Sequence, residues 1–116
     1  MTPRPGPLPA AEVLTLESLI APVPHGIASR VLAKNGGGTV TLFAFDAGTA
    51  LAEHTAPFDA LVQVLEGRFV VTVAGQASQA SSGTVVRLPA NVPHAVEAIG
   101  VARMLLTMLR ETAGPA

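Results

Sequence analysis

The fold is decided by residues 48–67, which read GTALAEHTAPFDALVQVLEG. One glycine opens this stretch and a second glycine closes it, and His54 lies in its first half. Residues 60–65 contain a single polar side chain in six. Short apolar runs bounded by turn residues are typical of β-strands, so the stretch predicts a strand over residues 61–65 that ends at Glu66-Gly67.

The same rhythm continues on both sides of this stretch. Residues 27–33 and 39–45 flank Asn35-Gly36-Gly37-Gly38, where left-handed backbone conformations are accessible and a hairpin is favoured. Further runs rich in Val, Leu, Thr and Met recur about every ten residues, and residues 25–110 show no sustained helical period. This pattern predicts an all-β sandwich or barrel. The apolar runs downstream are residues 69–73, 85–88, 94–99 and 102–109.

The N-terminal region has a different composition, with six of the ten prolines in the first 24 residues. Closely spaced prolines favour an extended chain, so residues 1–9 are expected to form a tail. The apolar spacing in residues 10–20 predicts a short amphipathic helix or turn, which Pro22 and Pro24 end. We therefore expect a tail over residues 1–24, a barrel over residues 25–110 and a second tail over residues 111–116.

Composition excludes several classes of function. The chain has 116 residues, 49% hydrophobic and 13% charged, which is typical of one globular domain. Its formal net charge of −1 gives no basic surface for nucleic acid, and no apolar stretch approaches a membrane span. Cysteine is absent, which excludes disulfides and thiolate ligands. A cytoplasmic protein without a nucleic-acid or membrane partner is expected.

Two of the expected strands are apolar on both faces. Residues 60–65 and 104–109 each contain one polar residue in six, whereas a strand with one wet face alternates. In a small barrel the outward face is covered by the N-terminal segment or by another subunit. The pattern therefore predicts a homodimer that uses an outer apolar face.

Two segments together resemble the paired motifs of the cupin superfamily. The first family motif, G-x5-H-x-H-x3-E-x6-G, matches at Gly48, His54 and Gly67, with Ala56 and Ala60 at the positions of the second histidine and the glutamate. The second, G-x5-P-x-G-x2-H-x3-N, matches at three positions and differs at two. Its matches are Gly83, Pro89 and His94, and its differences are Asn91 for the glycine and Ala98 for the asparagine.

The resemblance implies a double-stranded β-helix, a jelly-roll-like barrel with a pocket between two sheets. In that family the pocket usually holds a divalent metal on three imidazoles and one carboxylate. Here only His54 and His94 remain as candidate ligands, for zinc, nickel, iron or copper, and the alternative is a histidine pair with no metal bound. Gln63 is a candidate third ligand, although its odd spacing from Ala60 directs it to the opposite face unless a bulge intervenes.

Three functions remain open at this point. The leading hypothesis is a small-molecule-binding cupin whose pocket is marked by His54 and His94 and has mostly apolar walls. The alternatives are a metal-dependent enzyme of the dioxygenase or isomerase type, and an accessory or sensor protein that acts through a partner. The expected pocket residues are Ala56, Ala60, Val62, Val64, Met104, Leu106 and Met108.

Overall fold

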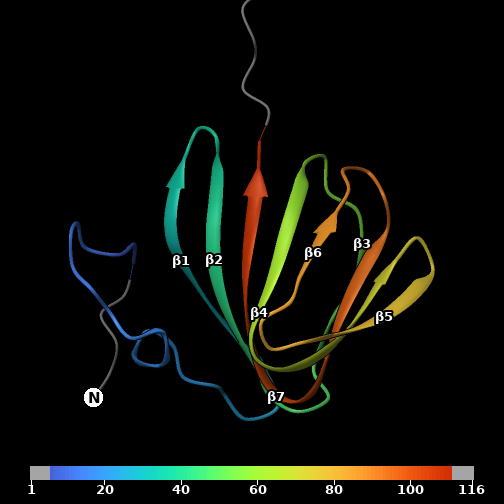
Figure 1. Cartoon of the computed structure of the whole chain (residues 1–116), viewed down its shortest axis with the longest axis horizontal. Coiled ribbons are helices and arrows are strands. Elements are labelled where there is room, and N and C mark those ends of the chain that lie inside the picture. The colour runs from blue at the N-terminus through green and yellow to red at the C-terminus, as the bar shows by residue number, and fades with distance from the viewer. Residues whose placement is uncertain (1–5, 111–116) are drawn as a thin grey trace, which may run out of the picture.

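A computed structural model describes residues 6–110, which form seven antiparallel β-strands and one short helical turn (Figure 1). The all-β prediction is therefore confirmed. The expected tails at residues 1–5 and 111–116 lie outside the described residues. The elements are η1 (Leu16–Ser18), β1 (Ile27–Asn35), β2 (Gly38–Phe45), β3 (Ala50–His54), β4 (Asp59–Val73), β5 (Gln76–Ser81), β6 (Val85–Leu88) and β7 (His94–Leu109).

Two long strands, β4 and β7, connect the two halves of the molecule. Their first and last parts pair with different neighbours: β7 pairs with β3 near its start and with β2 near its end. Strand β4 likewise pairs with β6 before its middle and with β5 after it. Figure 1 shows both strands turning at one end of the molecule and spreading apart towards the other. The sequence predicted separate segments on either side of Glu66-Gly67, whereas β4 continues through a bulge there.

Gly67 makes this bulge possible. Its φ of 77° lies in the left-handed region, and a Cβ at this position would stand 2.6 Å from the carbonyl oxygen of Val101. Only glycine meets both conditions without strain. The motif therefore requires a glycine at position 67 for a structural reason, because β4 packs closely against β7 at this residue.

The barrel interior is filled by side chains from both halves. Layer A consists of β1, β2, β6, the first half of β4 and the second half of β7; layer B consists of β3, β5 and the remaining halves. Buried Val62, Val64 and Met104 of layer A share one core cluster with Phe69 and Val71 of layer B. The two layers therefore pack face to face, as in a jelly roll.

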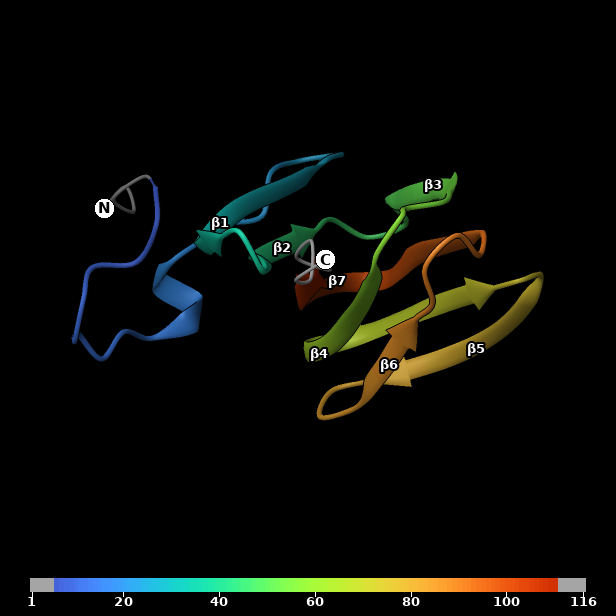
Figure 2. The ribbon, with the colours of Figure 1, turned by 90° about the horizontal axis from the view of Figure 1, so that it is seen from above.

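The N-terminal segment covers part of the outer face of layer A. Leu19 and Ile20 are buried in a second cluster with Leu32, Leu42 and Ala44. The expected helix over residues 10–20 is reduced to the single turn η1. Figure 2 shows this segment beside β1, away from β5 and β6. Within residues 6–110, no helix has the length and apolar character required to cross a membrane.

Candidate functional site

The loop before β7 fixes the position of His94. In this loop the backbone N–H of Ala90 donates to Oδ1 of Asp59 at 2.8 Å, and the N–H of Asn91 donates to the carbonyl of Ala56 at 2.7 Å. Asn91 has a φ of 62°, which explains why asparagine can replace the motif glycine there. The N–H of Ala90 and the guanidinium of Arg87 lower the pKa of Asp59, so this carboxylate stays charged and holds the loop.

The two motif histidines meet at the open end of the barrel, the end away from the bends of β4 and β7. His54, at the end of β3, pairs directly with His94, at the start of β7, after an irregularity in the β3 register. Their Nε2 atoms lie 3.2 Å apart and their ring planes are inclined by 71°. His94 is only 6% exposed, whereas His54 is exposed to solvent.

Hydrogen bonds to the backbone determine the tautomers of both rings. Nδ1 of His54 lies 2.8 Å from the carbonyl oxygen of Ala52, and Nδ1 of His94 lies 3.2 Å from that of Val92. A carbonyl oxygen only accepts, so each Nδ1 carries the proton, and Nε2 is the ring atom that offers a lone pair in this tautomer. Two Nε2 atoms at 3.2 Å are close enough to share one cation, either a proton or a metal ion.

The environment of His94 favours its neutral form. Burial lowers the pKa of His94, and a positive charge on His54 lowers it further, while the carbonyl of Val92 acts in the opposite direction. A neutral imidazole is the form that binds metals. Among residues 6–110, however, no group of three or more histidine, aspartate or glutamate side chains gathers around one point.

The other expected pocket residues occupy different environments. Most of them fill the interior: four are buried in the first core cluster and two are partly buried against it. Ala56 lies in the loop between β3 and β4, and its side chain is half-buried. Gln63 is exposed between the buried Val62 and Val64, so it faces outward and is not brought to the histidines. The four buried residues are Ala60, Val62, Val64 and Met104, and the two partly buried ones are Leu106 and Met108.

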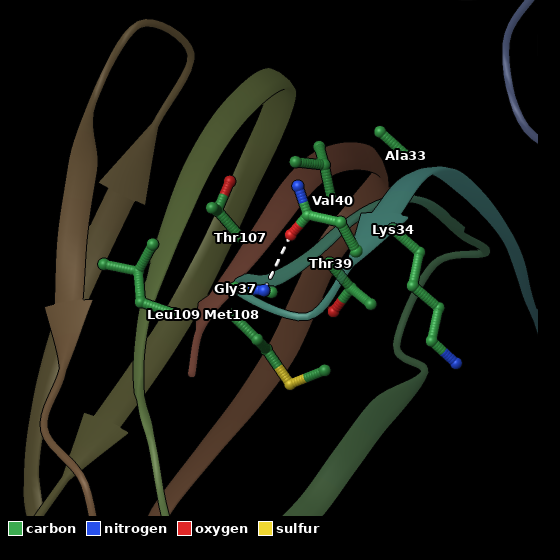
Figure 3. Close-up of a pocket in the computed structure, with 10 residues that line it drawn as sticks. Ala33, Lys34, Gly37, Thr39, Val40, Thr107, Met108 and Leu109 are labelled. Carbon is green, nitrogen blue, oxygen red and sulfur yellow. Dashed lines mark hydrogen bonds between the residues drawn. The ribbon is translucent and has the colours of Figure 1, made fainter. Parts of the chain in front are cut away.

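Two hollows are lined, apart from Met108, by residues that the sequence did not single out. One, of about 290 Å³, lies at the hairpin between β1 and β2, where Lys34, Thr39 and Met108 project to the same side (Figure 3). The other, of about 400 Å³, opens between β5 and β6 and includes Gln76 and Ser78. Strand alternation in the sequence could have indicated that Gln76 and Ser78 face inward. It could not have indicated that a cavity lies beside them.

A small jelly-roll barrel with two histidines at its open end defines the class of this protein. The family model described as a cupin domain matches residues 41–109, and the chain therefore belongs to the cupin domain family. The resemblance found in the motif spacing is confirmed. An uncharacterized protein of Streptomyces coelicolor is 38% identical over 56 residues, which are 48% of this chain and 53% of that protein. The chain thus matches about half the length of this curated relative.

Solved structures resemble the whole barrel. A cupin superfamily protein from Desulfitobacterium hafniense is 30% identical, with a TM-score of 0.84 over 93% of this chain and 99% of its own. A conserved protein of unknown function from Streptococcus pyogenes is 28% identical, with a TM-score of 0.85 over 91% and 93% of the two chains. These neighbours agree with the cupin fold.

Proposed function

We propose that this cupin binds a small molecule at the open end of its barrel, where His54 and His94 hold a divalent metal ion through Nε2. The observation that carries the proposal is the distance of 3.2 Å between the two Nε2 atoms. Two imidazole nitrogens bound to one tetrahedral zinc ion are expected about 3.3 Å apart. The observed separation of the two Nε2 atoms is close to this value, and the rings need to rotate so that both lone pairs point at one ion.

The donor set is incomplete, which favours weak binding and access for a ligand. Ala56 and Ala60 stand at the motif positions where other cupins have further metal ligands, and neither side chain can coordinate. Imidazole suits zinc, nickel, copper and iron. A bound ion would polarise an oxygen atom of the ligand as a Lewis acid. The two hydrogen bonds at Nδ1 hold the rings in the metal-binding tautomer.

Cobalt titration of EDTA-treated protein, followed by visible absorption and calorimetry, tests this proposal. We expect saturable binding by the natural sequence and a loss of about tenfold or more in affinity for His54→Ala and His94→Ala. His25→Asn is the control, because His25 is exposed at a φ of 59°, which asparagine tolerates. Equal binding by all variants, or none by the natural sequence, would contradict the metal site and leave a shared proton between the rings.

We also propose that the chain forms a homodimer through the outer face of layer A. The N-terminal segment leaves Val85 61% exposed, and the neighbouring Leu61 and Leu105 are only half-buried. A charge at the centre of an apolar interface disfavours association, so Val85→Glu is expected to lower the mass in light scattering from dimer to monomer. Val101→Glu, near the bend, is expected to leave the mass unchanged. A monomeric natural protein at micromolar concentration would contradict the proposal.

A further inference from the structure

The cavity between β5 and β6 has the size and the apolar floor of a ligand site. Its volume is about 400 Å³, and Val71 and Val73 of β4 form its floor together with Val86 of β6. Ligand pockets usually fall in the range of roughly 300–1,000 Å³ and combine apolar walls with a few polar groups. The cavity is therefore large enough for a small metabolite.

Strand backbones form the two walls of this cavity. Consecutive residues 78–80 of β5 and 84–87 at β6 line it, so main-chain atoms as well as side chains face the space. Within residues 6–110, β5 and β6 each pair with β4 alone, which leaves one edge of each strand unpaired. An unpaired edge presents alternating N–H donors and C=O acceptors, the pattern that an amide group complements.

The polar side chains in the lining are uncharged, apart from one cation that already has a partner. Gln76 and Gln79 offer carboxamides and Ser78 a hydroxyl, while the hydroxyl of Thr84 already donates to the carbonyl of Ser81 at 2.6 Å. No aspartate or glutamate of residues 6–110 lines the cavity, and the guanidinium of Arg87 pairs with Oδ2 of Asp59 at 2.8 Å. A charged ligand group would lose hydration here without gaining a free counter-ion. The lining therefore favours an uncharged ligand.

The floor of the cavity borders the histidine pair. Val73 is the direct neighbour of His94 in the sheet, and Gln76 is the direct neighbour of Val73 on its other side. Neighbouring strands lie about 4.8 Å apart, so Gln76 is roughly 10 Å from His94 across the sheet. A molecule of metabolite size spans this distance.

We infer that this cavity binds a small uncharged molecule that carries an amide group, with the amide against Gln76 and the strand edges and the rest of the molecule directed towards His94. The inference rests on the proposed function in placing the second end of the ligand beside the histidines. The amide site itself needs no metal, because neither histidine is among the lining residues.

Benzamide and benzoate are matched probes, since they have the same shape and differ in charge. Each is titrated into ¹⁵N-labelled, EDTA-treated protein. We expect benzamide to cause saturable shifts of the amide signals of β5 and β6 at millimolar concentration, and benzoate to bind about tenfold more weakly or less.

Two substitutions on β5 test the position of the site. Ser78→Phe places a ring in the cavity and is expected to weaken benzamide binding about tenfold. Ala77→Phe adds the same ring to an exposed neighbour outside the lining, and is expected to leave the affinity within about twofold. Aromatic residues suit exposed strand positions, so both variants should fold.

The results separate this inference from the metal proposal. Benzamide binding that survives in His54→Ala supports the amide site even if cobalt fails to bind. Cobalt binding without benzamide binding would overturn the amide site alone. Shifts that map elsewhere, equal affinity for benzoate, or no effect of Ser78→Phe would also overturn it.

Discussion

The bent end and the open end of the barrel differ in what determines their structure. At the bent end, β4 and β7 cross at Gly67, and Phe45, Phe69 and Ala102 are completely buried. At the open end, His54 is exposed and Val73 is half-buried. Backbone contact fixes the bent end, whereas side chains at the open end can change without altering the path of the chain. This difference explains how the chain keeps the glycine spacing of the family and loses two of its ligand positions.

Ala60 illustrates the freedom of the open end. Its side chain is 5% exposed and faces the interior at the position where the family motif has a glutamate. An alanine there packs against Met108 and Leu88 of the neighbouring strands, which pair with it in register. Losing the carboxylate therefore costs the fold little, because a buried charge without a metal is unfavourable.

Substitution at the bent end is expected to have the largest effect. Gly67→Ala would place a Cβ 2.6 Å from the carbonyl oxygen of Val101 and 2.8 Å from Cβ of Ala102, at a φ of 77°. Left-handed strain and overpacking together are expected to lower the free energy of unfolding by about 3 kcal/mol. Urea unfolding monitored by circular dichroism measures this loss.

Gly100→Ala separates the two causes. Gly100 also has a left-handed φ, of 74°, but within residues 6–110 no atom beyond its two chain neighbours lies within 4 Å of a Cβ built there. Its cost is therefore expected to be strain alone, about 1 kcal/mol. Equal losses for the two variants would contradict the view that close backbone contact fixes the bent end.

At the open end, Ala60→Glu is expected to strengthen metal binding. The new carboxylate would face the interior at the same end as His54 and His94 and supply a third ligand. We expect cobalt affinity to rise about tenfold, while the metal-free protein loses about 2 kcal/mol because the carboxylate is buried without a partner. Calorimetric titration and thermal unfolding with and without cobalt measure the two effects.

Gln63→Glu is the matched control for this gain. It adds the same carboxylate to the same strand, but Gln63 faces outward between the buried Val62 and Val64. Its cobalt affinity should equal that of the natural sequence. Unchanged affinity in Ala60→Glu would show that position 60 does not reach the histidine site.

Much of the fold could be predicted because its key positions obey local rules. Gly67 and Asn91 both adopt left-handed backbone conformations, which glycine and asparagine tolerate best. The hairpin between β1 and β2 forms at the glycines that predicted it. Of the short helix or turn expected over residues 10–20, a single turn forms at Leu16–Ser18, and Leu19 and Ile20 after it are buried on layer A.

The site was only partly predictable. Motif spacing marked His54 and His94 as candidates, and direct pairing of β3 with β7 brings them together. The expected apolar pocket walls, such as Val62 and Met104, instead contribute to the core, because interdigitation of two layers depends on side chains distant in sequence. The cavity beside Gln76 depends on where two edge strands separate, which strand periodicity does not encode.

The smallest expected effect is a pH dependence of stability at the open end. The pKa of His94 in the folded protein is below its ordinary value of 6.5, with burial as the main cause. The unfolded chain therefore binds a proton at a pH where folded His94 remains neutral, and the free energy of unfolding increases with pH. For EDTA-treated protein, stability should be complete above pH 6.5, fall as the pH drops below it, and level off below the folded pKa. The pKa values of Asp46 and Asp59 are lowered from 3.8, so the stability that these two carboxylates contribute is lost only as the pH falls below this value. Thermal unfolding measured from pH 6.5 down to about pH 4 should show a falling melting temperature for the natural sequence. The same measurement on His94→Gln should show no such fall. An identical fall in that variant would mean that other groups cause the pH dependence. It would contradict the view that His94 is buried as a neutral imidazole.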